Sequence, residues 1–203
     1  KAHNIPYRII KKSEFNHGTT RKYAISLIDA DIYILLTQDI SFANEHALEN
    51  ILKAFDDKKV GCAYGRQLPN KDADILAAHL RFFAYPQTNS IKTYEDRKRL
   101  GIYTCANSDN FAAYRKEALL NIGGLPENVI LAEDMYAAAK MLINGWKIAY
   151  RADAVIYHSH NYTLIQEFKR HFDTGVFHAM NPWILETFHA SISDGIKFLQ
   201  SSI

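Results

Sequence analysis

The sequence predicts an α/β domain with a mixed, mainly parallel sheet and helices on both faces. Short apolar runs alternate with amphipathic segments along the chain, the order found where helices join parallel strands. The chain has 203 residues, 48% of them hydrophobic, which is enough for one sizeable core. Residues 32–36 are all apolar and lead into Thr37-Gln38-Asp39. Such a run is typical of a strand buried on both faces, with polar groups beyond its carboxyl end.

Charge and cysteine usage narrow the class of protein. The net charge is +2, and the basic runs at 11–12 and 97–99 are too short for a nucleic-acid footprint. We expect these runs to be solvated surface, with contact to anionic lipid as the weaker alternative. Cys62 and Cys105 belong to no metal or redox motif, so we expect reduced core residues of a cytosolic protein. No apolar run approaches the roughly 20 residues of a membrane span.

The first elements are a strand and a helix joined by a turn. Residues 5–10 predict a strand that enters at a proline. Gly18 marks a turn, and Thr19 or Thr20 can cap a helix that runs to about residue 26. A glycine turn before a helix N-terminus suits an anion. An ordinary strand–turn–helix link explains this stretch equally simply and is preferred on these residues alone.

The remaining elements follow from periodicity and turn residues. In the middle of the chain we expect a helix over 45–55, a strand over 60–64, a helix over 72–83 and a long polar loop over 85–99. In the second half we expect a strand over 111–114 that can run antiparallel, a helix over 116–122 stopped by Gly123-Gly124, a helix over 134–145, strands over 146–150 and 154–157, and a last amphipathic helix with Leu164, Ile165, Phe168 and Phe172.

Three polar clusters end apolar segments: Gln38-Asp39, Glu133-Asp134 and His158-Ser159-His160. Carboxylates with an imidazole can hold a divalent cation, and a further carboxylate can serve as a general base. Taken singly, each cluster has a structural explanation, as a helix cap, as acids at a helix N-terminus, or as a polar strand end. Their combination and order are more specific.

The ordered motifs resemble those of a known family. They are residues 15–21 (FNHGTTR), 37–39 (TQD), 65–69 (GRQLP), 107–108 (NS), 123–127 (GGLPE), 133–135 (EDM), 157–162 (YHSHNY) and 168–175 (FKRHFDTG). Together they resemble the family 2 glycosyltransferases of GT-A (Rossmann-like) fold, in particular a rhamnosyltransferase-like branch. The resemblance covers nearly the whole chain.

The resemblance implies roles for the acids and for one histidine. Asp39 matches the last acid of an Asp-x-Asp motif and would bind Mg²⁺ or Mn²⁺ at a sugar-nucleotide pyrophosphate, with His158 completing the site. His160, farther from its strand, would have a supporting or acceptor-side role. Asp134 matches the base that deprotonates the acceptor, and Glu133 would orient that base or touch the acceptor. These are the expected metal and catalytic residues.

Four more residues are expected at the donor. Arg21 matches a basic residue near the nucleotide, Arg170 would lie near the departing diphosphate, and Gln38 and Arg66 belong to matching motifs. The chain departs from the family pattern at Thr37, which replaces the first metal acid, and at Lys22, where an asparagine is frequent. Nothing matches the family's first two strands. We therefore expect one N-terminally incomplete glycosyltransferase domain over 1–203, with a C-terminal helical part at 161–203.

The resemblance implies an inverting enzyme that moves a sugar, such as the deoxyhexose rhamnose, from a dTDP- or UDP-sugar to a saccharide or lipid-linked acceptor. The implied setting is cell-surface polysaccharide synthesis in the cytoplasm, at the inner face of the membrane. Two other classes stay open. One is a non-catalytic nucleotide- or sugar-binding module, and the other is a sugar-phosphate nucleotidyltransferase. Sugar transfer, rather than pyrophosphate release, would separate the two enzymes.

Overall fold

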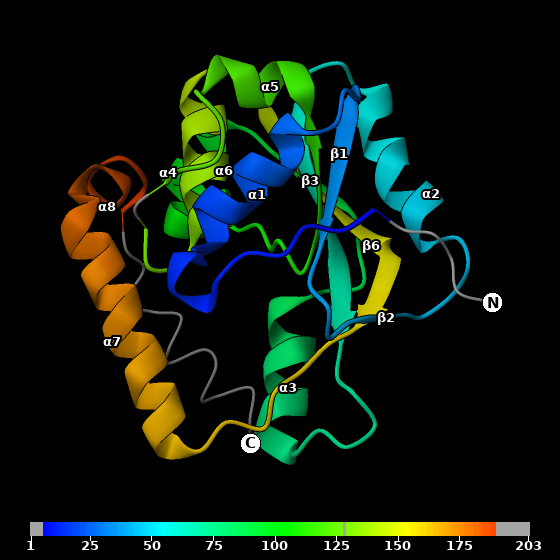
Figure 1. Ribbon diagram of the computed structural model, residues 1–203, viewed down its shortest axis with the longest axis vertical. Coiled ribbons are helices and arrows are strands. Elements are labelled where there is room, and N and C mark those ends of the chain that lie inside the picture. The colour runs from blue at the N-terminus through cyan, green and yellow to red at the C-terminus, as the bar shows by residue number, and fades with distance from the viewer. Residues whose placement is uncertain (1–5, 128, 190–203) are drawn as a thin grey trace.

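A six-stranded mixed sheet with helices on both faces forms the centre of the molecule (Figure 1). The computed structural model describes residues 6–127 and 129–189. The strands are β1 (Ile32–Leu36), β2 (Ser41–Phe42), β3 (Val60–Leu68), β4 (Ser90–Lys92), β5 (Phe111–Arg115) and β6 (Lys147–Tyr157). The α-helices are α1 (His17–Ser26), α2 (Ala47–Leu52), α3 (Ile75–Ala84), α4 (Arg97–Leu100), α5 (Lys116–Asn121), α6 (Glu133–Ile143), α7 (Leu164–Met180) and α8 (Pro182–Phe188).

The sheet has the order β1-β5-β3-β6-β2, and β4 also pairs with β6. Only β3 and β6 pair in parallel among the described strands, and the other pairs are antiparallel. The predicted mixed sheet and the antiparallel β5 are confirmed, but the expected predominance of parallel pairs is wrong. The chain leaves β3 at its carboxyl end and enters β5 at the same edge, so β5 opposes both of its neighbours. The carboxyl ends of β1, β3 and β6 therefore share one edge with the residues that precede β5.

Strand β1 lies at the end of the sheet order instead of inside it. Of its five residues only Tyr33 is buried, and Leu36 is 42% exposed. The expectation that this apolar run is buried on both faces is wrong for the described residues, because β1 pairs there with β5 alone. Its polar end is nevertheless placed at the predicted edge.

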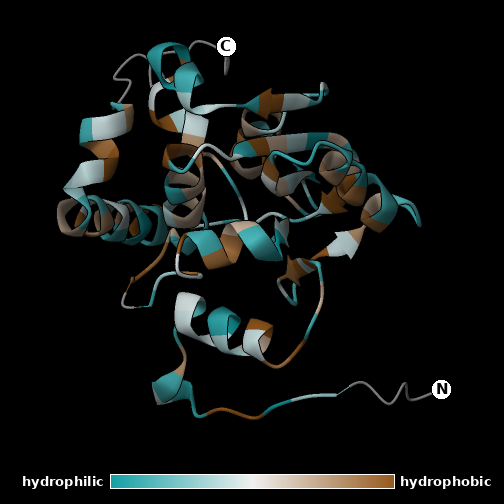
Figure 2. Ribbon diagram, turned by 90° about the horizontal axis from the view of Figure 1, so that it is seen from above, coloured by the Kyte–Doolittle hydropathy of each residue, from teal (hydrophilic) through white to brown (hydrophobic). Residues whose placement is uncertain are grey.

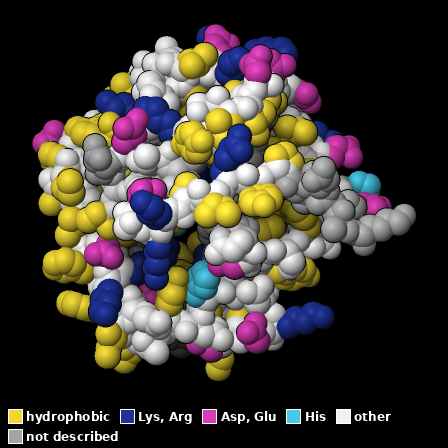
Figure 3. All heavy atoms as spheres, viewed as in Figure 1, with side chains coloured by type: hydrophobic (Ala, Val, Ile, Leu, Met, Phe, Trp, Pro, Cys, Tyr) yellow, Lys and Arg dark blue, Asp and Glu magenta, His cyan; other side chains and the backbone are white. Residues whose placement is uncertain are grey.

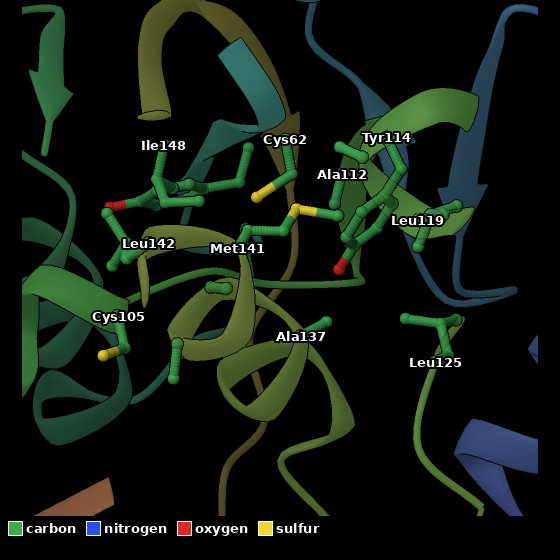
Figure 4. Packing of buried hydrophobic residues seen from close by; sticks show 14 of the residues in the cluster. Cys62, Cys105, Ala112, Tyr114, Leu119, Leu125, Ala137, Met141, Leu142 and Ile148 are labelled. Carbon is green, nitrogen blue, oxygen red and sulfur yellow. The ribbon is translucent and has the colours of Figure 1, made fainter. Parts of the chain in front are cut away.

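Two cores lie on the two faces of the sheet. On one face, Cys62 of β3 packs with Met141 of α6 and Ile148 of β6 (Figure 4). On the other face, Ala63 of β3 packs in a cluster with Ile51 of α2. Successive side chains of a strand point to opposite faces, so one strand supplies both cores. Cys62 and Cys105 are buried and free, as predicted.

The segment before α1 differs from the prediction. Residues 6–11 form no strand and run along the outside of α1 (Figure 2). Tyr7 and Ile9 are 78% and 88% exposed, and no described strand lies beside them to accept their backbone hydrogen bonds. The helix itself is confirmed, but its cap is Asn16 instead of Thr19 or Thr20. The Asn16 side chain accepts a hydrogen bond from the backbone N–H of Thr19 at 3.0 Å.

Two further boundaries are corrected. The predicted loop over 85–99 contains β4 and α4, and β4 is held to β6 by antiparallel pairing. The predicted strands at 146–150 and 154–157 form a single strand, β6, whose register against β3 shifts between Arg151 and Val155. The polar residues at this bulge resemble a turn in the sequence, although the strand continues through them.

The last predicted helix is confirmed as α7. Thr163 and Gln166 cap it through reciprocal hydrogen bonds, and α8 follows after Asn181. Residues 190–203 of the predicted C-terminal helical part lie outside the described residues. Among the residues that are described, no helix combines the length and the apolar character needed to cross a bilayer.

Candidate active site

A cavity of about 520 Å³ opens at the shared edge of the sheet, between the strand ends and the helices α3, α6 and α7. Asp39 reaches it from beyond β1, His158 from beyond β6 and Asn110 from just before β5. Asp134 of α6 and Arg170 of α7 also line the cavity. On the face seen in Figure 3, a histidine lies beside a group of Lys and Arg side chains. The cavity thus brings together carboxylates, imidazoles and the guanidinium groups of Arg81 and Arg170.

Asp39, His158 and His160 form a compact group, here called the metal cluster. The Oδ2 atom of Asp39 lies 3.4 Å from Nε2 of His158 and 3.4 Å from Nε2 of His160. One ligand atom from each residue lies within 4.8 Å of the other two. A first-row ion about 2.1 Å from each ligand would hold the ligand atoms roughly 3.0–3.4 Å apart. The donor set and its spacing therefore fit a divalent cation, with room for adjustment by the exposed Asp39.

Hydrogen bonds within the protein hold His158 in a fixed orientation. Its backbone N–H donates to the carbonyl of Leu68 at 2.9 Å, which continues the β3–β6 pairing. The Nδ1 atom lies 2.9 Å from the side-chain oxygen of Gln67 and 3.1 Å from the side-chain nitrogen of Asn110. In the tautomer that donates from Nδ1 to Gln67, the Nε2 lone pair faces Asp39. Burial, together with the positive charge of Arg81, lowers the pKa of His158 to about 4. The imidazole is therefore neutral near pH 7, as a metal ligand must be.

His160 is linked to helix α7. Its ring stacks on Tyr162 with centroids 5.0 Å apart and meets the His158 ring edge-on at 4.7 Å. The guanidinium of Arg170 lies 5.7 Å from the Tyr162 ring centroid. The second histidine of the motif thus belongs to the same cluster and joins it to the wall that carries Arg170.

Asp134 is placed by the start of α6. The residue before the helix, Ala132, has a left-handed backbone with φ of 62°, which is uncommon outside glycine. The two carboxylate oxygens of Asp134 accept hydrogen bonds from the backbone N–H groups of Met135 at 2.7 Å and Asp109 at 3.2 Å. Burial and the nearby Glu133 carboxylate raise the pKa of Asp134. A carboxylate that is fixed in place, faces a cavity and has a raised pKa is suited to accept a proton.

Three of the predicted site residues do not line this cavity. Glu133 is buried and forms an ion pair with Arg21, whose Nε lies 3.5 Å from Oδ2 of Asp109. The Nε of Arg66 donates to the backbone carbonyl of Tyr85 at 3.2 Å. The structure brings together the other five predicted residues: Gln38, Asp39, Asp134, His158 and Arg170. Donor contacts by Arg21 and Arg66 stay predictions.

The sequence interpretation missed the roles of Gln67 and of the segment 107–110. Gln67 is 1% exposed and donates to Ser108 at 2.8 Å while it faces His158. Asp109 is 2% exposed and contacts Asp134 through its backbone. The sequence signal for the segment 107–110 is its four polar residues directly before an apolar strand that can run antiparallel. An antiparallel strand begins at the edge where its neighbours end, so the residues before it lie at the functional edge. Gln67 carried no comparable signal.

A family model and two relatives identify the family of the chain. Residues 8–173 match the family model described as "Glycosyltransferase like family 2". The chain is 52% identical over 196 residues to the O-antigen chain rhamnosyltransferase WbaN of Salmonella anatum, covering 96% of this chain and 62% of that protein. It is 47% identical over 201 residues to the O-antigen chain rhamnosyltransferase RfbN of Salmonella typhimurium, covering 98% and 64%. The chain thus spans less than two thirds of each of these relatives.

Solved structures with low sequence identity share the fold. The mannosyltransferase PcManGT of Pyrobaculum calidifontis, solved with GDP-Man and Mn²⁺, superposes with a TM-score of 0.53 at 20% identity, covering 85% of this chain and 52% of that one. TarS of S. aureus, solved with UDP-GlcNAc, gives 0.52 at 18% identity, covering 72% and 39%. These similarities confirm the GT-A fold.

Proposed function

The chain belongs to the glycosyltransferase-like family 2, and from this premise we propose that it transfers a deoxyhexose such as rhamnose, with inversion, from a nucleotide-sugar donor to an O-antigen acceptor. One observation carries the proposal. A candidate proton acceptor, Asp134, and a candidate metal cluster open into the same cavity. The two rhamnosyltransferase relatives support the sugar and the acceptor class. Family membership favours sugar transfer over pyrophosphate release.

The proposed metal is Mg²⁺ or Mn²⁺, held by Asp39 and His158. His160 offers a third ligand atom at the same distance from Asp39. When bound, such an ion neutralises charge that develops on the departing diphosphate. The Mn²⁺ and GDP-Man recorded for PcManGT support this assignment. Thr37 supplies no carboxylate, so the histidines provide a larger share of the ligands than in an Asp-x-Asp site.

The proposed base is Asp134. Its carboxylate takes the proton of the acceptor hydroxyl while that oxygen forms a bond to the anomeric carbon of the donor sugar. The bond between that carbon and the diphosphate oxygen breaks on the opposite face, and this geometry inverts the anomeric configuration. The two backbone N–H groups on Asp134 hold its orientation during the attack.

The donor diphosphate is proposed to lie toward Gln38 and Arg170, which line the cavity beside the metal cluster. A guanidinium is suited to this place because it forms paired, charge-assisted hydrogen bonds with phosphate oxygens. A dTDP- or UDP-sugar is the proposed donor class. The nucleotide sugars recorded for PcManGT and TarS support a nucleotide-linked donor in general.

We further propose that the chain acts at the cytoplasmic face of a membrane on a saccharide or lipid-linked acceptor. Support comes from the O-antigen relatives and from α7, where Leu164, Ile165, Phe168 and Phe172 are between 63% and 85% exposed. Hydrophobic side chains gather along the edge formed by α7 in Figure 3. Exposed apolar side chains next to a site that takes a lipid-linked acceptor suit an interfacial location.

A donor screen tests the function. The protein is incubated with Mn²⁺, a synthetic saccharide acceptor and either dTDP-rhamnose, UDP-glucose or GDP-mannose, and mass spectrometry follows the acceptor. The proposal predicts addition of one deoxyhexose from dTDP-rhamnose and release of dTDP. Transfer from another donor would correct the sugar. Pyrophosphate production from a sugar phosphate and dTTP would contradict sugar transfer.

A further inference from the structure

A buried group of charges lies directly behind Asp134, outside the cavity lining. Arg21 of α1 pairs with Glu133 of α6, and its Nε lies 3.5 Å from Oδ2 of Asp109. These side chains are 15%, 7% and 3% exposed for Arg21, Glu133 and Asp109. The three residues are here called the Arg21 network. One guanidinium thus serves two buried carboxylates next to a third, Asp134.

The Arg21 network is physically connected to the proposed base. The backbone N–H of Asp109 donates to Oδ2 of Asp134, and Glu133 is its neighbour in the chain. The Asp109 carboxylate also accepts a hydrogen bond from the hydroxyl of Tyr114, which is itself held by the side-chain N–H of Asn107 at 2.7 Å. Any movement of Asp109 or Glu133 therefore changes the position of Asp134 or the charge beside it.

Helix α1 is fixed against the segment that precedes α6, so Arg21 has a defined place. A Cβ atom on Gly18 would lie 1.9 Å from the carbonyl oxygen of Pro126, so only glycine permits this approach. The Asn16 side chain donates to the carbonyl of Val129 at 2.8 Å. Gly18, for which the sequence leaves an anion site open but favours an ordinary link, lies in the first turn of α1 and permits the close packing of this helix.

We propose that Arg21 is a positioning residue, which holds Glu133 and Asp109 and so sets the orientation and the charge environment of Asp134. This inference rests on the proposed role of Asp134 as the base. Without the Arg21 guanidinium, its two buried carboxylate partners would have no counter-charge, which is strongly unfavourable. The pairing is therefore needed to keep all three carboxylates in place. Among the hydrogen bonds and ion pairs of the described residues, Arg21 reaches the cavity lining through His17, whose Nδ1 lies 3.2 Å from Nη1 of Arg21.

Two members of the Arg21 network change the pKa of Asp134 in opposite directions. The Glu133 carboxylate raises the pKa of Asp134, whereas the Arg21 guanidinium lowers it, both on top of a rise caused by burial. Other titratable or charged groups face this region from every packed element: His17 of α1, Asp109 and Tyr114 at β5, Cys62 of β3, Tyr85 after α3, and Arg170 and His178 of α7. Burial raises the pKa of Asp109, which Arg21 lowers and Glu133 raises, the same signs as for Asp134. Arg21 also lowers the pKa of His17. These groups therefore shift in the same direction as Asp134 when a charge is removed, and the limb reports the titration of the whole network.

The test measures the pH dependence of kcat for sugar transfer from dTDP-rhamnose in wild type, Arg21→Met, Glu133→Gln and the double variant. Arg21→Met should move the acidic limb of the profile to higher pH and Glu133→Gln should move it to lower pH, each by roughly one unit. The double variant removes one charge of each sign, so its limb should return close to that of wild type. Arg21→Lys keeps the charge and should recover part of kcat. If Arg21 acts through Asp134 and not on the donor, as proposed here in place of the expected donor contact, KM for the donor should stay within about threefold of wild type in all four variants.

Several results would overturn the inference. If both single variants lower kcat without moving the limb, or move it in the same direction, the residues act only in folding. If Arg21→Met raises KM for dTDP-rhamnose at least tenfold while the limb stays in place, Arg21 binds the donor. If Arg21→Met does not fold, the pH profiles of Glu133→Gln and Arg21→Lys test the proposal. An acidic limb that stays at its wild-type position in Glu133→Gln would contradict it. A transfer rate in Asp134→Asn equal to that of wild type would instead refute the proposed base. That experiment is independent of the Arg21 variants.

Discussion

The Nε2 atom of His158 lies 3.4 Å from the Oδ2 atom of Asp39, although the two residues follow different strands with β5 and β3 between them. The contact arises because β1 and β6 run in the same direction and end at the same edge of the sheet. His158 directly follows β6, whereas Asp39 lies in the short link from β1 to β2. Ser41 of β2 pairs with Tyr157 of β6, so this link carries Asp39 along the edge to His158. A metal-type cluster can form there without any segment having to rearrange.

Removing the Asp39 carboxylate should abolish metal binding. Asp39→Ala deletes the cluster's only carboxylate while leaving both histidines, and the side chain is 38% exposed, so folding should be little affected. Calorimetric titration with Mn²⁺ should show no binding under conditions in which wild type saturates. Asp56→Ala, a change at an exposed aspartate before the start of β3, at the other end of the strands from the cluster, is the matched control and should bind as wild type does. Unchanged affinity in Asp39→Ala would remove this residue from the site.

The two histidines should differ in how strongly they support Mn²⁺ binding. His158 is 4% exposed and oriented by Gln67, whereas His160 is held by ring stacking on Tyr162. His158→Ala should therefore weaken Mn²⁺ affinity more than His160→Ala does. Titration of both variants at pH 7.5 checks this order. A larger loss in the His160 variant would reverse the assignment, and no loss in either would make both histidines structural.

The pH dependence of Mn²⁺ binding should reflect the lowered pKa of His158. A metal competes with protons for the imidazole, so binding weakens as pH falls through the pKa of the ligand. Burial and Arg81 lower that pKa to about 4, so the His158 contribution should persist at pH 5 and be lost only near pH 4. An ordinary histidine would lose it near pH 6.5. Mn²⁺ titrations between pH 4 and 7 distinguish the two cases, and a midpoint near 6.5 that disappears in His158→Ala would contradict the expectation.

Converting the proposed base to its amide should separate binding from transfer. Asp134→Asn keeps the shape of the side chain and removes its ability to accept a proton. Transfer should fall by roughly 10²-fold or more, the scale of general-base catalysis. Donor affinity, measured by calorimetry with dTDP-rhamnose and Mn²⁺, should be nearly unchanged. Near-normal transfer in this variant would mean that another group removes the proton.

Lys92 should make the folded protein more stable at high pH. The residue is 6% exposed, and its ammonium donates to the carbonyls of Ala106 at 2.8 Å and Tyr103 at 3.2 Å, with no carboxylate among its described hydrogen-bond partners. Burial lowers the pKa of Lys92 to about 8, so the unfolded chain binds more protons than the folded one between about pH 8 and 10.5. The free energy of unfolding should rise by up to about 3 kcal/mol across this window because of this group.

Urea denaturation of wild type and Lys92→Met at pH 7.5 and 9.5 isolates that contribution. The buried thiols of Cys62 and Cys105 have raised pKa values and act in the opposite direction, but they are common to both proteins. Wild type should therefore gain stability relative to Lys92→Met as pH rises. A difference that is constant with pH would mean that Lys92 titrates normally.

The sequence identified the strand ends that carry chemistry, but not the order of the strands. Asp39 and His158 could be predicted because polar residues follow apolar runs directly, and a functional edge needs only that local pattern. The antiparallel insertion of β5 between β1 and β3 depends on how the chain returns from α3 and β4, which periodicity does not encode. The edge position of β1 follows from the same pairing.

The buried polar partners were harder to predict for a different reason. Gln67 and Asp109 act through contacts with residues far away in the sequence, His158 and Asp134. Gln67 belongs to the matching motif 65–69 and Asp109 to the polar run before β5, but neither pattern identifies the distant residue that the side chain or backbone contacts. The motif of Arg21 indicates a functional residue, but its pairing with Glu133 and Asp109 depends on the packing of α1 against α6, which the sequence pattern does not encode.

The anomeric configuration of the product tests the central claim most directly. Wild-type protein is supplied with Mn²⁺, dTDP-rhamnose and a saccharide acceptor, and NMR spectroscopy determines the configuration of the new glycosidic bond. If Asp134 acts as a base in a single displacement, the new bond has the configuration opposite to that of the donor, and Asp134→Asn forms it at least about 10²-fold more slowly. A product that retains the donor configuration, or one formed equally fast by Asp134→Asn, would contradict the account.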